Sequence, residues 1–335
     1  MKSIAFFNNK GGVGKTSLVY HLAWMFSDHG IKVLAVDLDP QANLTAMFLD
    51  EDRLETLWPD GEHPDTVLGS IRPILRGIGD IARPHVEKIT EHLGLVAGDL
   101  GLSRFEDKLS DAWPRCQLSD ESAFRTMTAF HRLIQRGAEW GIKWETEAGA
   151  DLVLVDVGPN LGAINRSALI ASDQVCLPLA PDLFSLQGLK NLGPTLSDWR
   201  AVWTDLLKKA PPDLPMPKGM MQPMGYIVMQ HGILDSRPVK AYKRWMDRIP
   251  NVYREVVLNE KIQTSVTVGG DPYCLSLLKH YRSLMPMAME ARKPIFFLKS
   301  ADGAIGAHIE AVRSCYRDFE KLAARIAANA GLAFD

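Results

Sequence analysis

The residues most able to do chemistry lie in a glycine-rich segment near the start of this 335-residue chain, Asn9 to Ser17. Phosphate oxygens need many close hydrogen-bond donors, and a glycine-rich turn that opens a helix offers backbone N–H groups and a positive helix terminus. In such a loop Lys15 reaches the β- and γ-phosphates of a nucleoside triphosphate, and the Thr16 hydroxyl binds Mg²⁺. We therefore expect ATP and Mg²⁺ as cofactors. The predicted nucleotide-binding residues are Lys10, Gly11, Gly12, Val13, Gly14, Lys15, Thr16 and Ser17.

Acidic residues follow two apolar runs and could complete a magnesium site. Asp39 comes shortly after the run at 32–36, and Asp156 ends the run at 151–155. Mg²⁺ prefers hard oxygen ligands and waters held by carboxylates. We therefore expect Asp39 and Asp156, together with the Thr16 hydroxyl, to lie at the metal site. Asp37 is a further candidate for the same site.

The elements that must position these residues predict an α/β fold. The runs 4–7 and 32–37 are apolar enough for strands covered on both faces, and 17–26 between them has the apolar spacing of a helix. Further apolar runs are predicted to be strands of the same sheet: 93–96, 151–156, 174–178, 225–229 and 294–297. A helix at 309–326 is expected to close the chain. The predicted fold class is a doubly wound, mostly parallel β-sheet flanked by helices, as in P-loop NTPases.

The middle of the chain predicts additions to this fold. Polar residues 51–64 suggest a surface loop, and 123–140 has the pattern of a helix. We expect a single domain over residues 1–335, with a divergent or inserted segment at about 50–92 and helical additions at about 111–149 and 200–222.

Composition narrows the class of protein. The hydrophobic share is 46% and the charged share 23%, which are ordinary values for a folded globular chain. A formal net charge of -2 gives no global attraction to nucleic acid, so any such binding needs a local basic patch. Four scattered cysteines suggest neither a zinc site nor a disulfide framework. Without a signal peptide or a long apolar run, we expect a cytoplasmic protein, and no membrane anchor is seen.

The phosphate loop departs from the strict pattern G-x-x-x-x-G-K-[ST], because Asn9 stands where that pattern has glycine. Residues 10–16, with the sequence KGGVGKT, contain an additional lysine, Lys10. This segment resembles the deviant Walker A loop of the ParA/MinD family of ATPases.

Two further segments resemble the same family. Residues 37–45 are similar to its D-x-D-P-Q-x-N switch segment, with Ala42 in a place that is commonly glycine. Residues 156–159 are similar to its Walker B pattern D-x-x-P, with Gly158 where proline is more usual. The absence of a helix-turn-helix before the loop makes ParA/Soj-type partition ATPases without that N-terminal domain the nearest resemblance.

The resemblance implies an ATP-dependent homodimer in which Lys10 of one subunit reaches the phosphates bound by the other. A cation delivered in this way would stabilise the transferring γ-phosphoryl group, like an arginine finger. By the same resemblance Asp39 positions the attacking water and Asp156 holds Mg²⁺ through a water, so the implied catalytic residues are Lys10, Lys15 and Asp39. Slow hydrolysis, stimulated by the dimer or by a partner, would time a switch between dimer and monomer.

Members of the ParA type coat nonspecific DNA when ATP is bound and release it when a ParB-like or other partner stimulates hydrolysis. One stretch of this chain has the basic residues that such phosphate contacts need. These candidates are Arg237, Lys240, Lys243, Arg244 and Arg248. This hypothesis predicts segregation or positioning of DNA or other cargo, and association with the nucleoid.

Three other functions remain open at this point. A MinD-like positioning ATPase should end in a basic amphipathic helix, whereas helix 309–326 mixes acids with its basic residues. Relatives of the nitrogenase iron protein bind an Fe–S cluster through cysteines near the switch segments, and no cysteine here has that setting. A regulatory ATPase outside partition could use segment 50–92 to bind a private partner.

Overall fold

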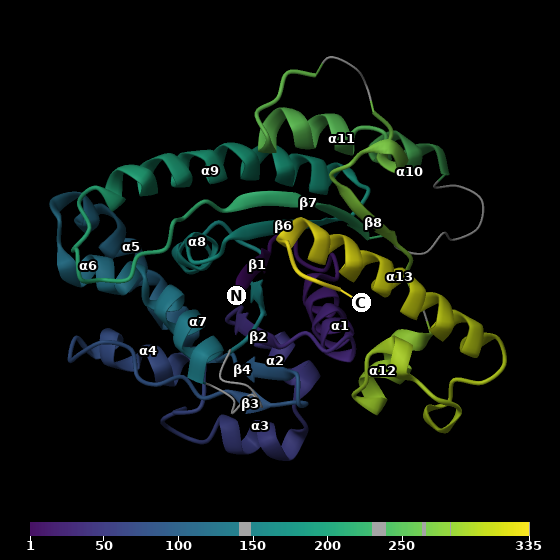
Figure 1. Ribbon diagram of the computed structural model, residues 1–335, viewed down its shortest axis with the longest axis horizontal. Helices are drawn as coiled ribbons and strands as arrows, with labels where there is room; N and C mark the ends of the chain where they lie inside the picture. Colours follow the sequence, from purple (N-terminus) through teal and green to yellow (C-terminus); the bar gives the residue numbers. More distant parts are fainter. Residues whose placement is uncertain (141–148, 230–238, 263–265, 282, 335) are drawn as a thin grey trace.

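The computed structural model describes residues 1–140, 149–229, 239–262, 266–281 and 283–334. The strands are β1 (Lys2–Phe6), β2 (Val33–Leu38), β3 (Glu87–Lys88), β4 (Leu93–Val96), β5 (Leu152–Val157), β6 (Gln174–Leu179), β7 (Gln222–Met229) and β8 (Cys274–Leu278). They form one sheet in the order β3-β4-β2-β5-β1-β6-β7-β8 (Figure 1). β3 pairs antiparallel with β4, and every other described neighbour pair is parallel. This confirms the predicted fold class.

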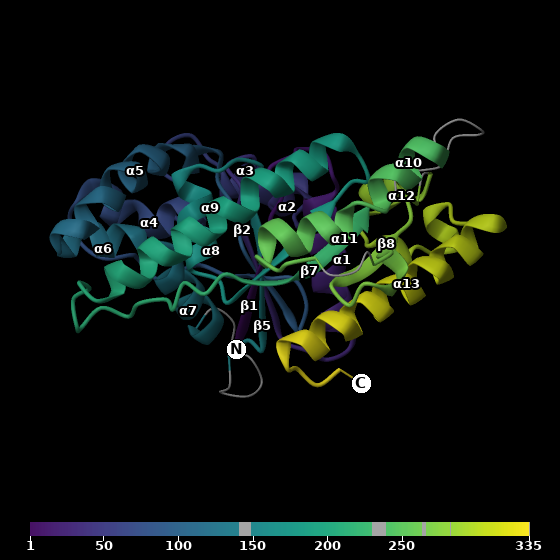
Figure 2. The same ribbon diagram turned by 90° about the horizontal axis from the view of Figure 1, so that it is seen from above.

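Helices cover both faces of the sheet, as the two views at right angles show (Figures 1 and 2). Alternate side chains of β1 enter different cores: Ala5 packs with helices α7, α8 and α9, and Ile4 with α1 and α13. The larger helices are α1 (Lys15–Asp28), α4 (Val67–Arg76), α5 (Phe105–Arg115), α7 (Ala129–Trp140), α9 (Leu183–Leu207) and α13 (Ala307–Ala330). The shorter ones are α2 (Asn43–Phe48), α3 (Glu51–Leu57), α6 (Glu121–Met127), α8 (Ala163–Ile170), α10 (Val239–Met246), α11 (Ile249–Val252) and α12 (Leu284–Ala291).

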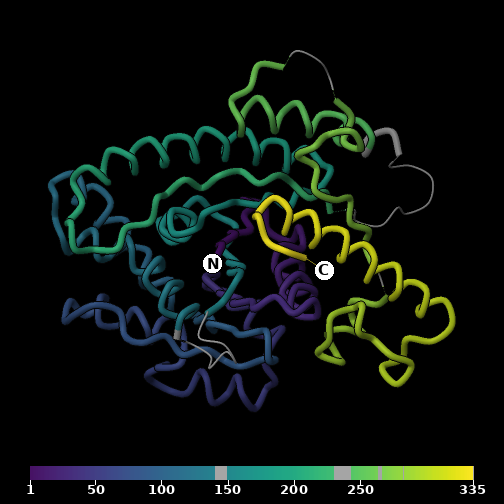
Figure 3. Tube along the Cα trace, in the orientation of Figure 1, coloured from purple at the N-terminus to yellow at the C-terminus, as the bar shows by residue number. Residues whose placement is uncertain are grey.

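The sheet register aligns the strands that carry the predicted site. β1 lies in the middle of the molecule, where the purple start of the trace in Figure 3 is surrounded by later segments. It pairs with β5 so that Phe6 is opposite Asp156, and β2 pairs with β5 so that Asp37 is opposite Asp156. Because these strands are parallel, their carboxyl ends meet at one edge, which is where ligands bind in such sheets.

Several local predictions were wrong. Residues 51–57 form helix α3 rather than a loop, because the Asp50 side chain accepts a hydrogen bond of 2.8 Å from the N–H of Arg53 and so caps the helix. Residues Ile295–Phe297 form a 3₁₀ turn instead of a strand, and the two edge strands of the sheet, β3 and β8, were not predicted. The expected helix at 123–140 is divided into α6 and α7 at Thr128.

The expected additions are also changed in detail. Helices α5, α6 and α7 fill the first one up to residue 140, and 141–148 lie outside the described residues. The second was expected to be helical over 200–222, but α9 ends at Leu207 and the chain then runs without a helix to β7. Prolines at 211, 212, 215 and 217 account for this, since proline lacks the N–H that a helix interior needs.

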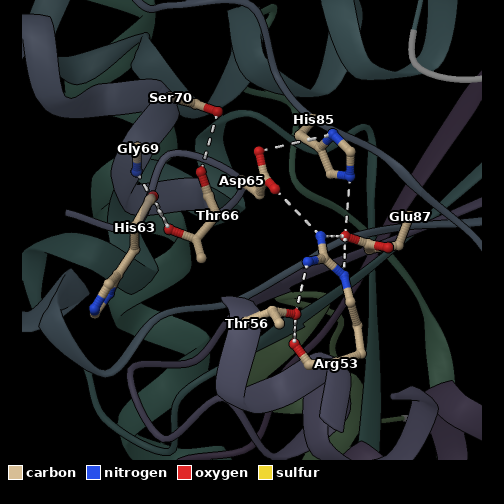
Figure 4. A network of polar contacts seen from close by, with 9 residues as sticks. All are labelled: Arg53, Thr56, His63, Asp65, Thr66, Gly69, Ser70, His85 and Glu87. Atoms are coloured by element: carbon tan, nitrogen blue, oxygen red, sulfur yellow. Dashed lines mark hydrogen bonds and ion pairs between the residues drawn. The ribbon is translucent and has the colours of Figure 1, made fainter. Parts of the chain in front are cut away.

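Segment 50–92 is fastened to the edge of the sheet by a polar network (Figure 4). The Nε–H of Arg53 in α3 donates a hydrogen bond of 3.1 Å to Glu87 Oε1 of β3. The Nη2 atom of the same arginine lies 3.2 Å from Asp65 Oδ2. His85 Nε2 lies 2.9 Å from the same Glu87 oxygen. The hydrogen bonds of Glu87 with His85 and Arg53 lower its pKa to about 2. The carboxylate is therefore the common partner of the Arg53 and His85 side chains.

Candidate nucleotide and metal site

The glycine-rich loop takes a shape that exposes backbone donors at the start of α1. Gly12 and Gly14 have φ of 74° and 86°, in the left-handed region where a residue with a Cβ is strained. α1 begins at Lys15, and within the described chain no side chain caps it at Gly14. Its first N–H groups are therefore available to an anion, which is the arrangement that phosphate binding requires.

Lys15 and Asp156 form a buried ion pair beneath this loop. Lys15 Nζ contacts Asp156 Oδ1, and the two side chains are 8% and 0% exposed. Burial raises the pKa of Asp156, while the charge and hydrogen bond of Lys15 and a hydrogen bond from Thr16 oppose that rise. The second oxygen, Oδ2, is buried without a hydrogen-bond partner among the residues that the structure describes. That oxygen has unused capacity to accept a hydrogen bond from a metal-bound water.

Asp37 and Asp39 have different hydrogen-bond partners although both stand at the carboxyl end of β2, Asp37 inside the strand and Asp39 just after it. Asp37 Oδ2 accepts hydrogen bonds from the N–H and hydroxyl of Thr45 at 2.9 and 2.8 Å, so it holds the first turn of α2. Burial, and next the charge of Asp156, raise the pKa of Asp37 to about 7. Asp39 Oδ1 accepts a hydrogen bond of 3.0 Å from the N–H of Gln41, and Asp39 lines the cavity described below. Asp37 thus holds α2 by hydrogen bonds, whereas Asp39 lies on the cavity wall.

A cavity of about 480 Å³ joins the predicted residues. Its wall contains all eight predicted nucleotide-binding residues, 10–17, together with Asp39. Three methionines that the sequence patterns did not single out close the other side: Met47 of α2, and Met285 and Met289 of α12. Their only sequence signal was the apolar content of two short helices, which does not distinguish a cavity wall from core.

A smaller apolar cavity of about 130 Å³ adjoins the start of α1. Ser17, His21, Leu278, Tyr281 and Phe319 are among the residues that line it. Burial lowers the pKa of His21 to about 4, so the ring is neutral at pH 7. Its Nδ1–H then donates to the Ser17 carbonyl at 2.7 Å, and its Nε2 accepts from the N–H of Ile295 at 3.1 Å. His21 therefore holds the 295–297 turn against α1.

The predicted metal ligands could bind Mg²⁺ only if waters and phosphate oxygens supplied the remaining ligands. Thr16 and Asp39 line the large cavity, and Asp156 lies under it. In the described ranges no group of three or more His, Cys, Asp or Glu side chains could hold a metal ion by itself. Mg²⁺ commonly keeps several waters and takes one or two carboxylates plus substrate phosphates. The donors present suit that mode of binding.

Lys10 is directed to the start of α9. Its Nζ forms an ion pair with Asp182. Asp182 also caps α9, because its Oδ1 accepts a hydrogen bond of 2.8 Å from the N–H of Ser185. The Lys10 Nζ lies 5.8 Å from the centroid of the Phe184 ring, and the Phe184 side chain is largely exposed. The lysine is thus held within its own chain, next to an apolar surface residue.

The basic candidates that the structure describes lie on α10 and just before α11, beyond α9 in Figure 1. Lys243, Arg244 and Arg248 are exposed. The guanidinium groups of Arg244 and Arg248 lie 5.2 and 5.4 Å from the ring centroid of Trp245, so one ring orders both. Arg237 lies outside the described residues, and so does the side chain of Lys240.

Residues 1–208 match a family model described as an AAA domain. Protein IncC of Escherichia coli is 29% identical over 200 residues, which cover 60% of this chain and 47% of IncC. Cell division protein PomZ of Myxococcus xanthus is 28% identical over 193 residues, which cover 57% of this chain and 50% of PomZ. The chain thus spans about half the length of these two relatives. The virulence plasmid ParA family protein pGP5-D of Chlamydia psittaci is 28% identical, over 80% of this chain and 83% of its own.

Solved structures share the fold over nearly the whole chain. Protein DIP2308 of Corynebacterium diphtheriae superposes with a TM-score of 0.67 at 23% identity, covering 98% of this chain and 99% of that one. An ATP complex of McdA from Cyanothece gives 0.62 at 15% identity, covering 99% and 97%. At these identities the likeness describes the fold.

Proposed function

Because this chain belongs to the ParA/MinD family of P-loop ATPases, we propose that it binds ATP with Mg²⁺, dimerises and hydrolyses the nucleotide slowly. The observation that carries the proposal is the cavity in which the glycine-rich loop, Lys15 and Asp39 meet above Asp156. The loop N–H groups would bind the β- and γ-phosphates. Lys15 would leave Asp156 for the phosphates.

The freed carboxylate of Asp156 would then face the metal through a water, with the Thr16 hydroxyl as a direct ligand. Bound Mg²⁺ would neutralise charge on the β- and γ-phosphate oxygens. Asp39 would orient the attacking water, which its position on the cavity wall allows. Lys10 of one subunit would leave Asp182 and reach the phosphates bound by the other subunit, where it would offset the charge of the transition state.

We also propose the smaller apolar cavity as the place of the adenine base. It begins at Gly12, Gly14 and Ser17, so a base lying there would be continuous with phosphates on the loop. Leu278 and Tyr281 offer it apolar and aromatic contact. The substitution Tyr281→Ala, at a partly exposed position that lines this cavity, should weaken ATP binding, and circular dichroism should show that the variant stays folded.

Binding of nonspecific DNA is the downstream role that the chain supports best. Arg244 and Arg248 flank Trp245 on an exposed face, which suits contact with phosphates. The relatives named for a virulence plasmid and for cell division support a role in segregation or positioning of DNA or other cargo. A ParB-like or other partner would stimulate hydrolysis and release the DNA.

The DNA proposal is tested with ATP-bound Asp39→Ala protein on arbitrary duplex DNA. We expect salt-sensitive retention, and a double variant Arg244→Ala/Arg248→Ala should weaken it equally on unrelated sequences, with a salt slope reduced by about 1 to 2. Arg313→Ala is the matched control, because this exposed arginine lies on α13 and pairs only loosely with Glu310, at 3.9 Å. Retention that is absent at low salt would refute DNA binding.

Two alternatives remain as proposals of lower rank. Lipid binding by the last helix conflicts with α13, whose Val312, Phe319, Leu322 and Ile326 are already buried in the core. No helix in the described part of the chain is long and apolar enough to cross a bilayer. A regulatory ATPase outside partition would use segment 50–92 to bind its partner. This alternative would be favoured if deletion of residues within segment 50–92 abolished binding of one partner protein and left DNA retention unchanged.

The ATPase proposal itself is tested by ATP-dependent dimerisation, measured by sedimentation with ATP, ADP and no nucleotide. We expect a dimer only with ATP and Mg²⁺. Lys15→Ala should lose nucleotide binding. A protein that stays monomeric with ATP, in the wild-type and Asp39→Ala forms alike, would overturn the switch.

A further inference from the structure

The loop between β5 and α8 forms part of the wall of the proposed ATP site. Pro159 lines the large cavity, and a Cβ at Gly158 would lie 3.4 Å from Asp39 Oδ1. Asn165 of α8 holds this loop: its Nδ2 donates to the carbonyls of Gly158 and Asn160 at 2.7 and 2.6 Å. Its Oδ1 accepts from the N–H of Gly158 at 3.1 Å. The loop is therefore placed by the position of α8.

α8 has no cap of its own, because its N-cap residue is Gly162. Glu106 of α5 supplies one from elsewhere in the chain. Its Oε1 accepts from the N–H of Ala163 at 2.5 Å, and its Oε2 accepts from the N–H of Ile164 at 2.9 Å. A carboxylate at a helix N-terminus satisfies donors that lack partners and interacts favourably with the helix dipole. Charge-assisted bonds of this kind are stronger than neutral ones.

Two other features show that this contact is built into the fold. A Cβ at position 162 would lie 2.6 Å from Glu106 Oε1, so glycine leaves room for the carboxylate. A second contact joins the same two helices, since the Arg166 guanidinium of α8 lies 4.3 Å from the ring centroid of Trp113 of α5. α8 is thus attached to α5 at its start and again one turn later.

We propose that Glu106 is a positioning residue for ATP hydrolysis. It fixes the start of α8, Asn165 then fixes the 158–160 loop, and the loop keeps Gly158 against Asp39 and Pro159 in the cavity wall. Helix α5 would therefore control the geometry around the attacking water, although none of its residues lines the ATP cavity. This inference rests on the proposed hydrolysis of ATP.

The test compares kcat and the dissociation constant for ATP in Glu106→Ala, Glu106→Gln and wild-type protein. We expect Glu106→Ala to lower kcat about tenfold, equivalent to about 1.4 kcal/mol, with ATP affinity changed less than about threefold. Glu106→Gln keeps one accepting oxygen and should fall between the two. The matched control is Asp120→Ala, which removes the cap of the neighbouring helix α6, where Asp120 accepts a hydrogen bond of 3.1 Å from the N–H of Ala123.

Amide hydrogen exchange supplies a readout that a general loss of stability would not move. In Glu106→Ala, exchange should accelerate over residues 158–164 and stay unchanged in β1 and β5, whereas Asp120→Ala should leave 158–164 unchanged. The proposal is overturned if kcat of Glu106→Ala equals that of Asp120→Ala, or if exchange over 158–164 does not respond. A wild-type protein without ATPase activity would instead remove the proposed function, and this inference with it.

Discussion

The ion pair between Lys15 and Asp156 can be measured by a double-mutant cycle in the nucleotide-free protein. Lys15→Met keeps the apolar stem of the side chain and removes the charge, and Asp156→Asn removes the opposite charge. Both side chains are almost wholly buried. Removing one partner of a buried pair leaves an uncompensated charge, at a cost of about 3–5 kcal/mol, whereas removing both is often close to neutral.

Lys15→Met should therefore lower the free energy of unfolding by about 3 kcal/mol at pH 8. Asp156→Asn should cost less, about 1–2 kcal/mol, because Lys15 also borders the open cavity and can be hydrated there. The double variant should recover at least about 2 kcal/mol relative to the sum of the single changes. Urea unfolding followed by circular dichroism measures all four proteins.

The pH dependence of the same cycle has a definite sign. Burial raises the pKa of Asp156 in the folded protein, and loss of Lys15 raises it further. An acid with a raised folded pKa is protonated at low pH without penalty and destabilises the fold as pH rises through that pKa. The loss in Lys15→Met should thus be smaller at pH 5 than at pH 8. Additive single effects, within about 0.5 kcal/mol, would refute the pairing.

Three further results are expected. Lys10→Ala should bind ATP normally but fail to pair or hydrolyse, and normal hydrolysis would contradict a role in trans. Asp182→Asn keeps the oxygen that caps α9 but no longer holds Lys10 by charge, so ATP-dependent dimerisation measured by sedimentation should tighten about two- to fivefold, as for a partly exposed pair. Glu87→Gln should cost about 1–2 kcal/mol at pH 7, discounted for partial exposure, and this loss should disappear as pH falls from about 4.5 towards 2, because the folded pKa of Glu87 is about 2. Urea midpoints at pH 7 and pH 3 test that difference.

The phosphate loop and the strand ends could be predicted because their signals are local. Glycines that need positive φ, a lysine at fixed spacing and an acid at the end of an apolar run are all visible within one short segment. The separation of Asp37 from Asp39 was not visible, because it depends on the hydroxyl of Thr45 eight residues later. Their sequence neighbourhoods are nearly the same, but their hydrogen-bond partners differ.

Contacts between distant segments explain the remaining failures. Glu106 caps a helix that begins 57 residues later, and Met285 and Met289 meet the loop from the far end of the chain. The local sequence around these residues does not indicate which distant segments they contact. The helix at 51–57 was missed for a different reason: its cap at Asp50 is a valid start signal, but the polar run after it resembled a loop.

The two ends of the large cavity are formed by elements that differ in how deeply they are buried. Its phosphate end depends on β1, β2 and β5, which are buried on both faces, so it should open only when the whole domain unfolds. Its other end is closed by methionines on the short helices α2 and α12, and Met289 is largely exposed. Local opening there costs little by comparison. A nucleotide would therefore enter and leave between the methionines, while the phosphate end of the site would be lost only when the domain unfolds.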